Sequence, residues 1–167
     1  VEQIFYKNRK SLTEKEVEEL VKSCVNMSAT RTGALIVLTT RAEPGPVIES
    51  GDVINSKVSG RLIESIFFKN SPLHDGAIVI FNRKIVAARC VLPLSKAIDM
   101  PAHMGLRHRA ARGMTENYHS LVVTVSEETG SISVFEPTVY QYNINSQVLK
   151  QKLTNWYGIG EQKKEEE

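Results

Sequence analysis

The sequence has few cysteines and no long apolar run, and each of these features excludes a class of protein structure. Its two cysteines, Cys24 and Cys90, stand in neither a metal-binding spacing nor a Cys-x-x-Cys pair. We therefore expect a reducing, cytosolic setting and two free thiols in the core. The longest apolar stretches, at 34–38 and 77–81, fall far short of the roughly 18 residues that span a bilayer. The composition argues against a disulfide scaffold and predicts no membrane-spanning helix within these residues.

The sequence also lacks a strong excess of charge. Lysine and arginine number 21 against 19 aspartates and glutamates among 167 residues, a formal net charge of +2. This charge is too small for a bulk attraction to nucleic acid or to an anionic membrane. Any polyanion must therefore be bound by a local cluster. An apolar content of 41% fits one compact domain and excludes a disordered chain.

Hydrophobic periodicity predicts both helices and strands. Helices are expected to begin near a capping residue or after a glycine, at Thr13, at Ser56 or Ser59, at Arg107, and at Asn145 or Ser146. Strands are expected where branched apolar residues form short runs, at 33–39, 77–81, 85–92, 121–125 and 132–135. The second and third of these strands form a hairpin, and so do the last two.

Two segments between these elements are predicted to be loops. Residues 41–52 hold two prolines and two glycines, so we expect an exposed loop there. Residues 93–105 form a loop whose length makes a purely connective role uncommon. We find no internal repeat and no second domain.

The first candidate site lies at the entrance to the strand at 77–81. Asp75 follows His74 and precedes Gly76, whose missing side chain lets a ligand or another backbone approach closely. A carboxylate in this place can hold a divalent cation beside a nucleotide. The alternative is that Asp-Gly is only a turn that starts the strand.

The second candidate is a basic cluster made of Arg107, His108, Arg109 and Arg112. Guanidinium groups grip phosphate oxygens two at a time, and the first turn of a helix adds backbone N–H groups. The alternative is a solvated basic face paired with acids. The neighbouring pair Ala110–Ala111 favours close packing over open solvent.

The third candidate is the turn at 126–130. It holds two adjacent glutamates, which suit a catalytic or metal-binding role, although a turn of this composition is usually only a turn. His103 and His119 have no partner at ligand spacing, so we expect them in loops or at the surface.

Taken in order, five segments resemble the bacterial diadenylate cyclase domain, most closely its membrane-anchored CdaA type. They are GALIV at 33–37, PLHDGA at 72–77, LPLS at 92–95, GLRHRAA at 105–111 and VSEETG at 125–130. The match covers roughly residues 13–135, and the joint occurrence of Asp-Gly-Ala and Arg-His-Arg about thirty residues apart is highly specific. The resemblance implies synthesis of cyclic di-AMP from two ATP molecules. It also implies an α/β fold, a single domain with a central mixed β-sheet surrounded by helices.

The resemblance implies roles for particular residues. Asp75 is expected to bind Mn²⁺ or Mg²⁺ and to help activate the ribose 3′-hydroxyl, with His74 as a further metal contact. Arg107, His108 and Arg109 are expected to grip the triphosphate, and with Asp75 they form the catalytic set. The other expected ATP-binding residues are Gly76, Ala77, Leu92, Gly105, Leu106, Ser126 and Glu128.

Three positions depart from the family pattern. Leu106 stands where a threonine or serine often touches phosphate, and Val91 stands where a tyrosine often stacks on adenine. An acid commonly found near His119 is absent. These departures concern the nucleotide contacts and leave Asp-Gly-Ala and Arg-His-Arg intact.

The product ring of such an enzyme is two-fold symmetric. One site per chain therefore requires two chains that face each other across their nucleotides. We expect a homodimer for catalysis, ATP as the substrate and no nucleic-acid partner. The alternatives are a catalytically silent module that binds ATP or a cyclic dinucleotide, and an RNA-binding domain, although the basic cluster lacks interleaved aromatics for base stacking.

The resemblance also implies domain limits and a location. Residues 1–12 are expected to be a lead-in that follows a membrane segment, residues 13–158 the cyclase domain and residues 159–167 a disordered tail. The sequence opens at Val1 without a methionine, and the basic side chains at positions 7, 9 and 10 suit the cytoplasmic side of a membrane span. We expect the full protein to hold this domain on the cytoplasmic face of the bacterial cell membrane.

Overall fold

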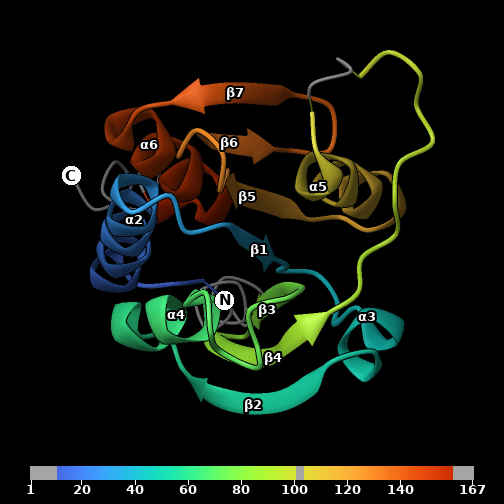
Figure 1. Cartoon of the computed structure of the whole chain (residues 1–167). Coiled ribbons are helices and arrows are strands. Elements are labelled where there is room, and N and C mark those ends of the chain that lie inside the picture. Colours follow the sequence, from blue (N-terminus) through green and yellow to red (C-terminus); the bar gives the residue numbers. More distant parts are fainter. Residues whose placement is uncertain (1–10, 101–103, 160–167) are drawn as a thin grey trace.

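The fold was taken from a computed structural model, which describes residues 11–100 and 104–159. These residues form one sheet of seven strands in the order β2-β4-β3-β1-β5-β6-β7 (Figure 1). The strands are β1 (Ala34–Leu38), β2 (Asp52–Lys57), β3 (Ala77–Phe81), β4 (Lys84–Cys90), β5 (Leu121–Val125), β6 (Ile132–Phe135) and β7 (Tyr140–Ile144). β1 and β3 run parallel and the other neighbours are antiparallel. The expected mixed sheet is therefore confirmed.

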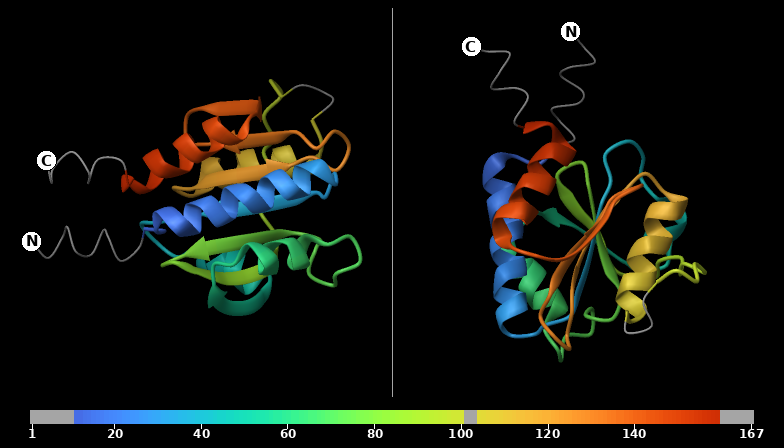
Figure 2. Two further views of the ribbon diagram at one scale, coloured as in Figure 1. Left: turned by 90° about the vertical axis from the view of Figure 1, so that its left-hand side faces the viewer. Right: turned by 90° about the horizontal axis from the view of Figure 1, so that it is seen from above.

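Helices cover both faces of this sheet. They are α2 (Glu14–Ala29), α3 (Gly45–Glu49), α4 (Gly60–Phe67), α5 (Leu106–Asn117) and α6 (Ser146–Tyr157). Helices α2, α4 and α6 lie on one face, and α3 and α5 lie on the other (Figure 2). The single α/β domain expected from the sequence is confirmed.

The central strand β1 shows why two cores form. All five of its residues are buried, since successive side chains point to opposite faces and both faces are covered. Ile36 and Leu38 pack with residues of α2, α4 and α6, whereas Leu35 and Val37 pack with residues of α3 and α5. The continuous apolar run in the sequence is the signature of this double burial.

Capping side chains set where the helices begin. The Thr13 hydroxyl accepts a hydrogen bond from the backbone N–H of Glu16, and the Glu16 carboxylate accepts one from the N–H of Thr13. Ser59, rather than Ser56, caps α4, and Asn145, rather than Ser146, caps α6. Each cap satisfies a backbone donor that has no partner inside its helix.

The structure corrects the predicted loop at 41–52. Helix α3 lies inside this segment, preceded by Pro44, and its Val47 is buried against the core. Strand β2 follows at once and includes Ser56, which the sequence analysis considered as a helix start. Strand β7 was also missed. Both missed strands lie at edges of the sheet, and neither has the continuous apolar run that marks β1 and β3.

Both cysteines are free and buried, as expected. Burial raises the pKa of the Cys24 thiol to about 12 and that of Cys90 to about 11.

Ile159, which the sequence analysis placed in the tail, packs against the core. The rest of that tail, residues 1–10 and His103 lie outside the described residues. Within the described ranges, no helix has both the length and the apolarity to span a bilayer.

Candidate active site

A pocket of about 670 Å³ opens at the end of the sheet where β1 and β3 begin and where β4 and β5 end. The start of α5 forms another wall. Nine residues selected from the sequence line it: Asp75, Gly76, Leu92, Gly105, Leu106, Arg107, His108, Ser126 and Glu128. The fold thus brings together segments that lie far apart in the chain.

The Asp-Gly pair enters the pocket at an irregular point of the sheet. Gly76 has a φ of +128°, and a Cβ there would lie 2.8 Å from the Cys90 carbonyl oxygen and 2.9 Å from the Cα of Arg89. Arg89 also adopts a positive φ of 56°, and the β3–β4 register shifts nearby. Glycine is needed here for both backbone conformation and close approach. This bulge places the exposed carboxylate of Asp75 at the pocket.

Arg89 is a charged residue of the pocket that the sequence analysis missed. Its Nε donates to the Asp52 carboxylate at 2.9 Å. This hydrogen bond raises the pKa of Arg89, and the charge of Asp75 raises it further. Arg89 and Asp75 thus bring opposite charges to the lining of the pocket. The hydrophobic periodicity of the sequence does not identify Arg89 as a pocket residue, because the direction of its side chain depends on the bulge.

Arg107 and His108 enter the pocket from the first turn of α5. The Nη1 atom of Arg107 lies 3.4 Å from Oε1 of Glu127, another lining residue. The His108 ring lies 5.9 Å from the ring of Phe135 and 6.0 Å from that of Tyr142, between centroids. Both side chains are partly buried, so the surrounding protein restricts their positions.

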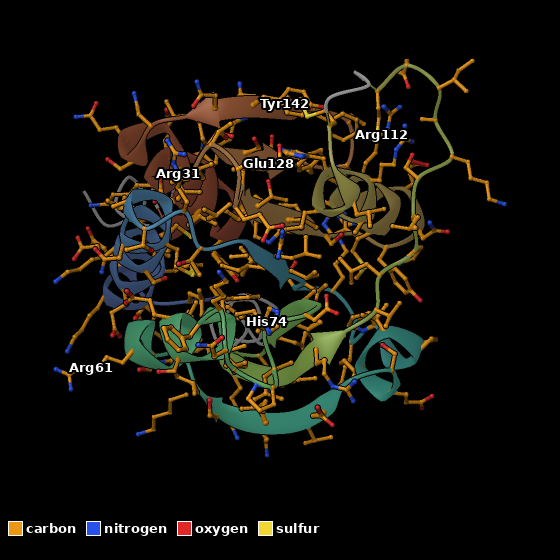
Figure 3. All side chains as sticks on the ribbon, viewed as in Figure 1. Arg31, Arg61, His74, Arg112, Glu128 and Tyr142 are labelled. Carbon is orange, nitrogen blue, oxygen red and sulfur yellow. The ribbon has the colours of Figure 1, made fainter. Side chains whose placement is uncertain are left out.

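Arg109 does not line the pocket. Its Nη1 donates to the carbonyl oxygens of Ser95 at 3.4 Å and Ala97 at 3.3 Å. One turn further along α5, Arg112 pairs with Asp99 at 2.9 Å, on the side of the helix that faces the loop (Figure 3). These two arginines fasten the loop after β4 to α5.

His74 and Ala77 also lie outside the pocket lining. The Nδ1 atom of His74 is 2.6 Å from the carbonyl oxygen of Ser71, and Ala77 is fully buried at the start of β3. In Figure 3, His74 and Glu128 lie on opposite sides of β1. The geometry therefore offers no direct support for His74 as a metal contact.

The turn after β5 is shaped by Ser126. Its hydroxyl accepts hydrogen bonds from the backbone N–H groups of Glu128 and Thr129, each at 3.2 Å. Ser126, Glu127 and Glu128 all line the pocket. The hydroxyl organises the turn that presents the two glutamates, a role that Ser-containing turns commonly have.

Carboxylate oxygens are the groups of this pocket that are suited to hold a metal ion. Asp75, Glu127 and Glu128 line it, and hard divalent cations prefer such oxygens, completing their shell with water and phosphate. Among the described residues, no three His, Cys, Asp or Glu side chains already form a metal-binding group. The residues fit a cation held by Asp75 together with the phosphates of a bound nucleotide.

The pocket also has an exposed apolar rim. Val91, Leu94 and Leu106 line it and are 69%, 54% and 72% exposed. Large apolar side chains gathered at the mouth of a pocket are typical of surfaces that a ligand or another protein covers. Two of the three departures from the family pattern, Val91 and Leu106, are thus part of this rim.

Comparisons with known proteins agree with this geometry. Cyclic di-AMP synthase CdaA of Bacillus subtilis is 40% identical over 140 residues, which cover 84% of this chain and 51% of CdaA. The chain thus spans about half the length of that relative. A double mutant of DacA from Staphylococcus aureus superposes with a TM-score of 0.84 at 37% identity, covering 86% of this chain and 96% of DacA.

A second solved structure, from Bacillus cereus, is described as a hypothetical membrane spanning protein. It superposes with a TM-score of 0.75 at 33% identity, covering 84% of this chain and 67% of the other. The family model described as DisA bacterial checkpoint controller nucleotide-binding (DAC) matches residues 21–139. The resemblance drawn from the sequence is confirmed, and this chain belongs to the DAC family of nucleotide-binding domains.

Proposed function

We propose that the full protein is a diadenylate cyclase, which joins two ATP molecules into cyclic di-AMP and releases two pyrophosphates. The pocket carries this proposal, because it gathers Asp75–Gly76, Leu106–His108 and Ser126–Glu128 at one end of the sheet. These are the segments on which the family resemblance rests. The relative CdaA is named a cyclic di-AMP synthase.

The pocket lining offers the two kinds of surface that ATP needs. Leu35, Leu92 and Ala110 are buried apolar residues of its lining, and they offer an apolar surface to the adenine. Arg107, with Ser126 nearby in the lining, offers donors to the phosphates. An arginine and backbone N–H groups at a helix start are effective phosphate ligands.

The reaction needs an attack by a ribose 3′-oxygen on an α-phosphorus, with pyrophosphate leaving in line. Diadenylate cyclases are ATP-using enzymes that need divalent metal ions, and Asp75 is the residue that would hold Mn²⁺ or Mg²⁺. Once bound, the cation lowers the pKa of the hydroxyl and neutralises phosphate charge. Arg107 and His108 stabilise the negative charge on the phosphate oxygens.

Two chains must cooperate, since each has one such pocket among its described residues and the product contains two nucleotides. The exposed rim of Val91, Leu94 and Leu106 supports a face-to-face dimer, because a second copy would cover it. An isologous contact of this kind places the two nucleotides across a two-fold axis. Each ATP then supplies one nucleophile and one electrophile.

The same proposal places the domain at a membrane in the full protein. CdaA of Bacillus subtilis is about twice as long as the matched region, and the Bacillus cereus neighbour is described as a hypothetical membrane spanning protein. Fractionation of cells that express the full gene product tests this location. Recovery of all the protein in the soluble fraction would contradict it.

The substitution Asp75→Asn tests the function. It keeps the size of the side chain and removes the charge that holds the metal, so we expect product formation to fall at least about 100-fold. Cyclic di-AMP and pyrophosphate are measured with purified protein, ATP and Mn²⁺ or Mg²⁺. Glu18→Gln is the matched control, because Glu18 pairs with Lys150 at 3.1 Å on the surface formed by α2 and α6.

Two outcomes separate the alternatives, and one measurement serves as a folding control. Near-normal product from Asp75→Asn at saturating ATP and metal would show that Asp75 has been assigned wrongly. ATP binding by the wild type without any pyrophosphate release would favour a silent nucleotide-binding module. Thermal unfolding at the wild-type temperature shows that the variant is folded.

A further inference from the structure

Gly33 opens the GALIV segment, and neither the fold nor the proposed reaction has yet given it a role. It is buried and lies directly before β1, two residues ahead of the pocket residue Leu35. No positive φ is found at Gly33, unlike at Gly76 and Gly130. The backbone conformation therefore does not require glycine at this position.

The space around Gly33 shows what glycine does there. A Cβ added to Gly33 would lie 2.6 Å from Nη2 and 2.7 Å from Nη1 of Arg107, with Cζ nearer still. Its three nearest neighbours all belong to that guanidinium. Van der Waals contact between carbon and such atoms needs about 3.5 Å. The guanidinium thus occupies the volume that any side chain at position 33 would fill.

Arg107 reaches this slot across the pocket. The residue belongs to α5, whereas Gly33 precedes β1 and Glu127 follows β5. β1 and β5 are paired neighbours, with Ala34 opposite Val125. The guanidinium therefore lies over the ends of two adjacent strands, in the slot at Gly33 and with Nη1 3.4 Å from Glu127 Oε1. These contacts hold the plane of a group that is otherwise free to rotate on a long side chain.

We infer that Gly33 is a positioning residue, which fixes the guanidinium of Arg107 in the orientation needed to grip a nucleotide phosphate. The inference rests on the proposed function for the identity of the ligand. A methyl group at position 33 must push the guanidinium out of the slot. Because phosphoryl transfer relies on position, a displacement of about 1 Å can cost on the order of 100-fold in rate.

Gly33→Ala tests the inference. The displaced atoms are the flexible end of a side chain, so we expect the thermal unfolding temperature to stay close to that of wild type. We expect kcat to fall at least about tenfold, with a smaller change in the KM for ATP. Gly45→Ala is the control, because a Cβ there meets nothing within 4 Å, and it should leave both constants unchanged.

A double-mutant cycle shows whether Gly33 acts through Arg107. Gly33→Ala is introduced with and without Arg107→Ala, and ATP affinity is measured by titration calorimetry for all four proteins. We expect weaker binding from Gly33→Ala alone and less than about twofold further change once Arg107 is gone, since contacting residues are not additive. An equal loss in both backgrounds would overturn the inference, because the methyl group would then act on the sheet.

Two further outcomes test the role of Gly33 and separate it from the proposed function. If Gly33→Ala fails to fold, the double variant is expected to fold, because Arg107→Ala vacates the slot; its failure would overturn the inference. If the wild type makes no cyclic di-AMP, the proposed function fails. The coupling between Gly33 and Arg107 in ATP binding would then still be measurable.

Discussion

The two arginines of the Arg-His-Arg motif point in different directions. Residues two apart on an α-helix lie about 200° apart around its axis. Arg107 accordingly lines the pocket, whereas Arg109 donates to the carbonyl oxygens of Ser95 and Ala97. The motif thus combines one arginine that faces the pocket with one that holds the neighbouring loop.

Lysine substitutions separate these two roles. Arg107→Lys keeps the charge and loses the two-pronged grip on phosphate, so we expect kcat/KM to fall by about 10- to 100-fold. Arg109→Lys loses contacts to the loop, so we expect a smaller loss, accompanied by faster proteolysis of the loop. Steady-state kinetics and limited proteolysis measure the two effects. Wild-type turnover in both variants would instead favour a solvated basic face.

At the residue scale, the sequence predicts those site residues that belong to a specific motif. Asp75 and Arg107 were found because the types and spacing of their neighbours are specific. Glu127 was considered as one of the two adjacent glutamates of the turn at 126–130, whereas Arg89 was missed, since the direction of its side chain depends on a bulge. Backbone irregularities of this kind leave no hydrophobic period for a sequence analysis to detect.

At the scale of elements, α5 and the loop after β4 form one unit. The backbone N–H of Ser95 donates to the carbonyl oxygen of Arg109 at 3.0 Å, and the Ser95 hydroxyl donates to Glu116. Gly113 lets the loop approach, because a Cβ there would overlap the backbone of Pro93. The loop supplies Leu94 to the pocket, so its attachment shapes the rim.

Gly113→Ala tests this attachment. A Cβ would lie 2.8 Å from the Ser95 backbone nitrogen and closer to the Pro93 carbonyl, and backbone atoms cannot move aside as a side-chain end can. We expect a loss of about 1–3 kcal/mol in the free energy of unfolding from overpacking. This exceeds the gain of up to about 1 kcal/mol from the helix propensity of alanine.

Urea unfolding measures the difference against Gly45→Ala. Gly45 also lies in a helix, and its Cβ would meet nothing within 4 Å. Equal stability of the two alanine variants would mean that the loop is not pinned by Gly113.

The elements that the sequence analysis found and missed differ in burial. β1, β3 and β5 are almost wholly buried, and their apolar runs are plain in the sequence. β2 and β7 lie at edges of the sheet and α3 is short, and none of the three has the continuous apolar run of the buried strands. Tertiary contacts, rather than local pattern, decide the structure of such segments.

At the scale of the whole molecule, the proposed reaction needs an encounter between two chains. Each chain brings one Asp75 and one Arg107, which in the proposed reaction together serve one ATP. We therefore expect specific activity to rise with protein concentration until the facing dimer is saturated. Product formation is measured over a hundredfold dilution beside light scattering. Flat activity into the low nanomolar range, with no change between monomer and dimer, would count against the face-to-face mechanism.

Mixing wild-type and Asp75→Asn chains gives a sharper test of the same mechanism. If both bond-forming sites need an intact aspartate, an excess of the inactive chain traps wild-type protein in mixed dimers that cannot close the ring. We expect cyclic product to fall with the fraction of free wild-type partners. A linear intermediate, joined once and still bearing its triphosphate, is expected to accumulate if a mixed dimer completes one bond. A single chain that binds both nucleotides would lose activity only to the extent that the variant sequesters ATP, so excess ATP would restore it. Persistent inhibition at excess ATP therefore assigns the two bonds to two chains.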